Sequence, residues 1–195
     1  MRIHFLISIG LPGLGVAQMP WATERKVKDA LEYWGFIVKY VNLRPSPDLV
    51  AVKFLDLPHR LKHVWYIEVK GSNQWRIPVK QLKALVELAS VATQRPCVVG
   101  LPFVAVVGDG LIEFYNGYEM LLAEPTAVEV DEDGRELVRL EAFNPVLTLD
   151  EATYKVLGGY EDLVNVLTRK PLEEAFWRLW NALADYYAKQ KGNTT

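Results

Sequence analysis

The sequence has only one cysteine, Cys97, and no uninterrupted apolar run of eighteen residues. A single cysteine excludes an internal disulfide and a cysteine-rich zinc site. We expect Cys97 to be a packed core residue in a reducing compartment. The lack of a long apolar run argues against a membrane span. Residues 3–17 are apolar but are interrupted by Pro12 and three glycines, so we expect a short strand over 3–9 and a turn, and no signal peptide.

Two strand-like segments of the first half end in charged side chains. Asp48 follows a proline and opens the apolar run 49–52, and Glu68 and Lys70 close the run 64–70. Because side chains alternate along a strand, Glu68 and Lys70 share one face while their apolar neighbours enter the core. Two carboxylates suit Mg²⁺, and an amine beside them can orient or deprotonate a water molecule. The alternative is an edge strand whose charged side chains simply face water.

An amphipathic helix is predicted on each side of these strands. The first covers residues 23–36 and ends at a glycine, and Glu24 lies on its inward row, three positions before Val27. The second covers residues 79–92, with Gln81 at the start of its inward row. Both polar side chains therefore point toward the strands. The alternatives are a first-turn acid that complements the helix dipole and an ordinary polar residue in a first turn.

In this order of elements the chain resembles the PD-(D/E)XK nuclease superfamily, and within it the archaeal Holliday-junction resolvase-like endonucleases, over about residues 20–108. The resemblance implies an α/β fold with a central mixed sheet flanked by helices, and hydrolysis of DNA with Mg²⁺ or Mn²⁺. It implies that Asp48 and Glu68 bind the metal, that Lys70 is the catalytic lysine, and that Glu24 and Gln81 complete the catalytic set. The chain departs from those resolvases in its length, in its net charge of −2 and in the shortness of segment 42–46, where they have a flexible serine-containing loop.

Charge is unevenly distributed along the chain. Residues 53–83 hold seven Lys or Arg against two Asp or Glu, whereas residues 109–162 hold fourteen acids against three bases. The basic segment surrounds the predicted site, as a phosphate-contacting surface should. His59 and His63 lie at the predicted hairpin tip and are expected to be solvated, with metal binding as the alternative. The predicted contacts to nucleic acid are made by Lys53, Arg60, Lys62, Trp75, Arg76, Lys80 and Lys83. For each of these the alternative is a solvated or partly buried side chain.

The second half continues the sheet and then extends it. Residues 96–107 read as a buried strand, and Asp109-Gly110 predicts a hairpin to residues 111–115. A second hairpin is predicted over 126–140, and helices over about 150–168 and 171–189. The apolar stripe of the last helix is assigned to the intramolecular core, with a homodimer seam as the alternative. We expect a core of residues 1–115 and an acidic extension of residues 116–195, packed together as one domain.

The sequence therefore predicts a cytoplasmic, metal-dependent deoxyribonuclease, with branched or junction DNA as the first choice of substrate. One alternative is a catalytically silent subunit that uses the same fold for DNA binding or assembly. Another is a nuclease for single-stranded DNA or RNA. The acidic half is expected to be a solvated surface, with a basic protein partner or a second metal as alternatives.

Overall fold

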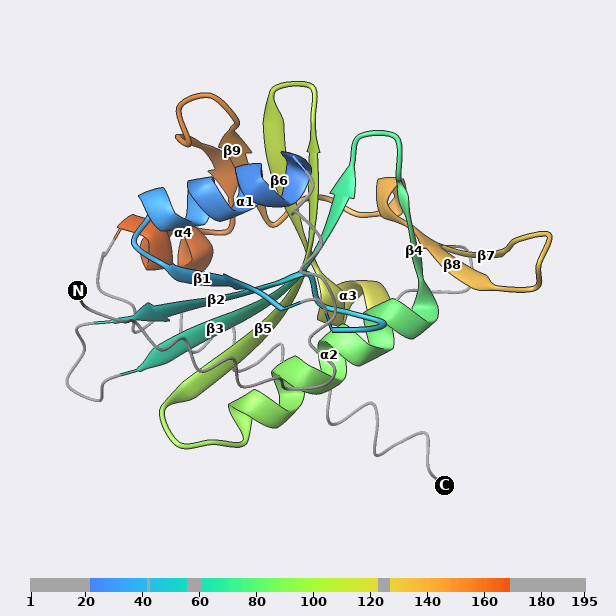
Figure 1. Cartoon of the computed structure of the whole chain (residues 1–195), viewed down its shortest axis with the longest axis horizontal. Coiled ribbons are helices and arrows are strands. Elements are labelled where there is room, and N and C mark those ends of the chain that lie inside the picture. Colours follow the sequence, from blue (N-terminus) through green and yellow to red (C-terminus); the bar gives the residue numbers. More distant parts are fainter. Residues whose placement is uncertain (1–21, 42, 56–60, 123–126, 169–195) are drawn as a thin grey trace, which may run out of the picture.

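The computed structural model describes residues 22–41, 43–55, 61–122 and 127–168 (Figure 1). The strand predicted at 3–9 and the helix predicted at 171–189 lie outside the described residues. The described part is an α/β structure with a large mixed sheet flanked by helices, as the sequence predicts. Within these ranges no helix combines the length and the apolar character that a membrane crossing requires.

The central sheet has seven strands in the order β1-β2-β3-β5-β6-β9-β10. Strands β3 and β5 run parallel, and the other neighbouring pairs of this sheet run antiparallel. Strand β3 therefore has a partner on both sides, which excludes the predicted alternative of an edge strand. The bounds are β1 (Ile37–Tyr40), β2 (Leu49–Phe54), β3 (Lys62–Gly71), β5 (Val98–Gly108), β6 (Leu111–Asn116), β9 (Leu147–Asp150) and β10 (Val156–Gly159).

A second, three-stranded sheet has the order β4-β8-β7 and projects to one side of the molecule (Figure 1). Strands β7 (Val128–Val130) and β8 (Glu136–Arg139) form the hairpin predicted over 126–140, and β4 (Arg76–Pro78) pairs with β8. The hairpin predicted at Asp109-Gly110 is also confirmed. Both of its turn residues have positive φ, 53° and 79°, which the Asp-Gly pair accommodates.

Helices cover the central sheet on both faces. Helices α1 (Ala22–Tyr33) and α4 (Glu161–Thr168) pack on one face, and α2 (Val79–Thr93) and α3 (Gly117–Leu121) pack on the other (Figure 1). The predicted spacing of apolar residues places Val27 and Leu31 of α1 against the odd-numbered residues of β3, such as Trp65. The opposite core joins Leu82 and Leu85 of α2 to the sheet and to β4 and β8.

The helix predicted over residues 150–168 is wrong in its first half. Residues 147–150 and 156–159 form the antiparallel strands β9 and β10, and only Glu161–Thr168 is helical. Leu147 and Leu149 are buried and alternate with half-buried polar residues, which is the period of a strand and not of a helix. The consecutive glycines at 158 and 159 further disfavour a helix.

Helix α2 packs very closely on β5 at Gly100. A Cβ added there would lie 2.1 Å from the carbonyl oxygen of Ala89, which is helix backbone and cannot swing away. We therefore expect Gly100→Ala to lower the free energy of unfolding by about 2 kcal/mol, measured by urea denaturation. Gly158→Ala is the matched control, because an added Cβ at Gly158 meets nothing within 4 Å. Equal stability of the two variants would contradict this close approach.

Candidate active site

The candidate site lies where β2 begins and β3 ends. These strands are antiparallel, with Leu49 opposite Ile67, so that Asp48 lies beside the end of β3. The backbone N–H of Asp48 donates to the Ile67 carbonyl at 3.0 Å, and the Asp48 Oδ2 atom accepts from the backbone N–H of Val69 at 2.8 Å. Strand pairing and this side-chain contact together hold the half-buried carboxylate at the strand end.

Glu68 is the most deeply buried acid of the predicted set, with 3% of its surface exposed. Its Oε1 atom accepts a hydrogen bond from Lys70 Nζ at 2.8 Å, and its Oε2 atom accepts one from Ser46 Oγ at 2.8 Å. Burial raises the pKa of Glu68, the Lys70 ammonium lowers it in part, and the charge of Asp48 raises it. The carboxylates of Asp48 and Glu68 are therefore close enough to influence each other electrostatically.

Lys70 connects the acids to helix α2. Its Nζ atom contacts Glu68, and it also donates to Gln81 Oε1 at 3.2 Å. The Gln81 Nε2 atom donates in turn to the carbonyl of Pro45 at 3.0 Å. Pro45 and Ser46 thus join the segment before β2 to both β3 and α2. The structure brings together Asp48, Glu68, Lys70 and Gln81 of the predicted catalytic set.

The position of Glu24 relative to the site follows from its place in α1 and from the contact of its neighbour Thr23. It lies half-buried in the first turn of α1. The adjacent Thr23 approaches Gly71 at the end of β3, its Cγ2 atom 4.0 Å from where a Gly71 Cβ would stand. Among the described residues, no group of three or more His, Cys, Asp or Glu side chains could hold a metal ion. Glu24 therefore does not join Asp48 and Glu68 in a three-carboxylate cluster.

The two remaining carboxylates fit a magnesium-type cation by their chemistry. Mg²⁺ binds proteins through one or two carboxylates and keeps several water molecules. An ionised carboxylate offers about four acceptor positions, so the hydrogen bonds from Ser46 and Lys70 leave acceptor capacity on Glu68. Asp48 has one oxygen engaged by the Val69 N–H. Asp48 and Glu68 are the residues that could hold such an ion.

Ser46 is a member of this network that the sequence did not predict. Its side chain is 3% exposed and its hydroxyl donates to Glu68. By the sequence resemblance, the short segment 42–46 is a departure from the resolvases, which have a flexible serine-containing loop there. The only local signal is its place two residues before Asp48, in Ser-Pro-Asp, and a serine beside a proline in a loop is too common to indicate a site.

The predicted contacts to nucleic acid differ in how far the structure exposes them. Lys62, Lys80 and Lys83 are exposed, and Arg60 lies outside the described residues. Trp75 is half-buried against the α2 core. The prediction for Lys53 is wrong: it is 3% exposed, and its ammonium donates to the carbonyls of Trp34 at 2.7 Å and Leu167 at 3.1 Å.

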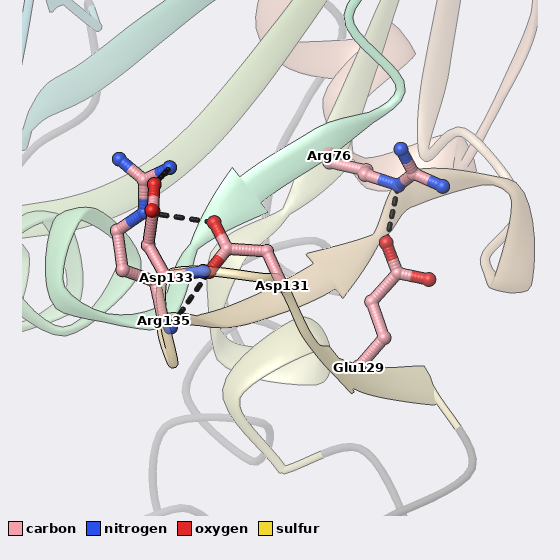
Figure 2. Close-up of polar contacts among 5 residues, drawn as sticks. All are labelled: Arg76, Glu129, Asp131, Asp133 and Arg135. Atoms are coloured by element: carbon pink, nitrogen blue, oxygen red, sulfur yellow. Dashed lines mark hydrogen bonds and ion pairs between the residues drawn. The ribbon is translucent and has the colours of Figure 1, made fainter.

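Arg76 lies on the small sheet and pairs with Glu129 of β7 (Figure 2). Nearby, Arg135 pairs with Asp131 and Asp133 at the tip of the same hairpin (Figure 2). Acids of the second half thus compensate part of the basic segment, because the β7–β8 hairpin folds onto β4. The side chain of Arg76 remains 61% exposed, so it is accessible in spite of its partner.

Two further predictions are corrected by the structure. His63 is 1% exposed and lies within β3 opposite Lys53, not at a solvated hairpin tip. Burial, and then the charge of Lys53, lower the pKa of His63 to about 4. His59 lies outside the described residues. Cys97, predicted as a core residue, is exposed, because it forms the turn before β5 with a φ of 59°.

Comparison with known proteins gives a likeness among solved structures. No family model matches the sequence, and no curated protein matches it. Among solved structures, the chain is similar to the 1.6 Å resolution structure of Hjc, a Holliday junction resolvase from the archaeal hyperthermophile Archaeoglobus fulgidus. The TM-score is 0.40 and the identity 19%, over 62% of this chain and 84% of that chain. At this level the likeness concerns the fold alone, and we transfer no functional residue from it.

Proposed function

We propose that this chain is a Mg²⁺- or Mn²⁺-dependent endonuclease that hydrolyses phosphodiester bonds of DNA. The observation that carries the proposal is the position of Lys70 Nζ, which lies 2.8 Å from Glu68 Oε1 and 3.2 Å from Gln81 Oε1, at the strand end that also carries Asp48. An ammonium held beside carboxylates that can bind a metal suits phosphodiester hydrolysis, because it can stabilise charge that develops in the transition state.

Each side chain has a separate part in this proposal. Asp48 and Glu68 hold the cation, which polarises the phosphodiester and lowers the pKa of the attacking water when it is bound. Lys70, as an ammonium, orients that water or offsets charge that develops on the phosphate. Gln81 keeps the ammonium in position through its bond to Pro45, and Ser46 fixes the Glu68 carboxylate.

Glu24 and the exposed lysines complete the proposal. Glu24 supports the metal or the substrate from the first turn of α1, which lies near the end of β3. Lys62, Lys80 and Lys83 are exposed and supply positive charge for contacts to phosphate. On the basis of the sequence resemblance, we propose branched DNA as the substrate and the cytoplasm as the location of the protein. A panel of junction, flap, duplex, single-stranded DNA and RNA substrates, each with and without EDTA, tests this choice.

Metal binding can be measured without turnover. We expect Asp48→Asn to weaken Mn²⁺ binding at least tenfold in isothermal titration calorimetry, because one of two charged ligands is lost. Cleavage should be lost together with metal binding. Glu87→Gln on the exposed side of α2 is the matched control and should bind Mn²⁺ as the unaltered protein does. Unchanged Mn²⁺ affinity in Asp48→Asn would remove Asp48 from the site.

A catalytically silent DNA-binding subunit is the second candidate, and one observation favours it. Both oxygens of Glu68 already accept hydrogen bonds from protein donors, Ser46 and Lys70. A buried ion pair of this kind can serve the structure alone. In that case the protein binds DNA and cleaves none of the substrates in the panel, with or without metal.

A further inference from the structure

The face of the central sheet that carries Glu68 and Lys70 extends across the two outer strands. Side chains alternate along each strand, and the register pairs Val52 with both Ile37 and Val64. Residues two apart on each strand therefore continue this face away from the candidate site. The open face, as we name it, consists of Ile37, Lys39, Val50, Val52, Phe54, Lys62, Val64 and Tyr66.

The open face carries large apolar side chains that are accessible to solvent. Ile37 is 57% exposed and Phe54 is 56% exposed, and Tyr66 is half-buried. On the same face of the neighbouring strand β5, helix α2 approaches so closely that Gly100 has no room for a Cβ. Helix α2 thus covers β5 and borders β3, and within the described ranges no helix packs on this face of β1 and β2.

The charge of the open face has one sign. Lys39 and Lys62 are exposed, and the Lys62 ammonium lies 5.4 Å from the ring centre of Phe54. Arg95, at the end of α2, is near enough to Tyr66 to act on its hydroxyl electrostatically. Among β1, β2 and β3, Glu68 is the one acid on this face, and it is paired with Lys70; Asp48 lies opposite Glu68, just before β2. An anionic partner is therefore favoured over a cationic one.

We infer that the open face binds a single-stranded segment of DNA and leads it to the candidate site. Aromatic rings beside lysines on an accessible sheet surface suit unpaired bases, which stack on the rings while the cations contact phosphates. A duplex keeps its bases stacked inside, so that it would contact the lysines but would leave the exposed ring of Phe54 unused. The inference rests on the proposed function, because it names the form of substrate that the same site receives.

The geometry of β3 supports a continuous path. From Lys62 to Lys70 the strand advances by roughly 26 Å, and its side chains on this face run in order from the Phe54–Lys62 pair past Tyr66 to Glu68 and Lys70. A forked or flapped DNA would then lay its unpaired arm on the open face. The phosphodiester to be cut would lie at the end of that arm.

Binding can be tested separately from cleavage, by fluorescence anisotropy in EDTA. The probes are a labelled oligothymidine of roughly 20 nucleotides, which exceeds the contact length expected here, and a blunt duplex of the same length. We expect Phe54→Ala to weaken binding of the single strand about tenfold and binding of the duplex less than twofold. Phe54→Trp should keep the single-strand affinity because it keeps a stacking ring.

Matched controls lie elsewhere on the surface. Tyr33 is an aromatic residue of α1 that is 63% exposed, and Tyr33→Ala should leave single-strand binding unchanged. Lys62→Glu should weaken single-strand binding more than the same change at Lys155, an exposed residue just before β10. Thermal unfolding midpoints within about 2 °C of the unaltered protein confirm that these exposed substitutions are folded.

The outcomes separate this inference from the proposed function. If Phe54→Ala leaves single-strand affinity unchanged while the protein still cleaves DNA, the inference is overturned and the nuclease proposal stands. If no DNA is cleaved but single-strand binding depends on Phe54, the open face is confirmed and the nuclease proposal fails. If Phe54→Ala converts a dimer to a monomer without changing single-strand affinity, the face joins two copies of the chain, and the inference is overturned.

Discussion

Replacement of Lys70 by alanine is expected to lower the rate of DNA cleavage by about 10²–10⁴-fold, the usual contribution of a positioned acid–base group. The ammonium lies between Glu68 and Gln81, and its side chain is only 12% exposed. No other Lys or Arg makes a hydrogen bond or ion pair with Glu68 among the described residues. Single-turnover cleavage of a forked substrate, with metal and enzyme in excess, measures the chemical step directly.

Measurements of both stability and cleavage distinguish a catalytic role for Lys70 from a purely structural one. Alanine at this position leaves the buried Glu68 without its counter-charge, so the variant should be less stable as well as inactive. The double variant Lys70→Ala with Glu68→Gln removes the unpaired charge and should regain stability but not activity. Lys155→Ala is the control for loss of one exposed lysine. Recovery of cleavage in the double variant would show that the ion pair serves folding alone.

Acidification from pH 6.5 to pH 4 is expected to remove about 3 kcal/mol of unfolding free energy through His63 alone. Burial, and then the charge of Lys53, lower the pKa of His63 to about 4. In the unfolded chain His63 binds a proton near pH 6.5, whereas in the folded protein it binds one only near pH 4. Stability from this residue is complete above the unfolded pKa and falls as the pH drops through that window.

The measurement compares the unaltered protein with His63→Gln by urea denaturation at several values between pH 7 and pH 4. Glutamine cannot take up the proton, so the variant should lose less stability on acidification. The raised pKa of Glu68 acts in the opposite direction, because the folded protein favours its protonated form, and it contributes equally to both proteins. Parallel pH profiles would show that His63 is not held neutral by its surroundings.

The predicted catalytic residues show how much of the site a local sequence pattern can predict. Alternation along residues 64–70 was enough to place Glu68 and Lys70 on one face, because the period of a strand is a local property. Apolar spacing in the same way located α1 and α2, and hence Glu24 and Gln81 near their first turns. The pattern could not show that Gln81 reaches Lys70 and also Pro45, since these contacts depend on how α2 crosses β3.

The errors at Lys53 and His63 share one physical cause, which is burial by partners that are distant in sequence. Lys53 looks like a surface cation in a basic segment, yet its ammonium meets the carbonyl of Leu167, 114 residues away. His63 is buried because β3 lies inside the sheet and beneath α1, not at its edge. Cys97 is exposed because the chain turns there into β5.

The sequence by itself determined the α/β class, the two flanking helices, both hairpins and the strand positions of Asp48, Glu68 and Lys70, because periodicity and turn chemistry act over a few residues. Only the tertiary structure decided that Ser46 contacts Glu68, that Lys53 and His63 are buried, and that Phe54 is exposed. These outcomes depend on which elements pack together, and packing is set by the whole chain.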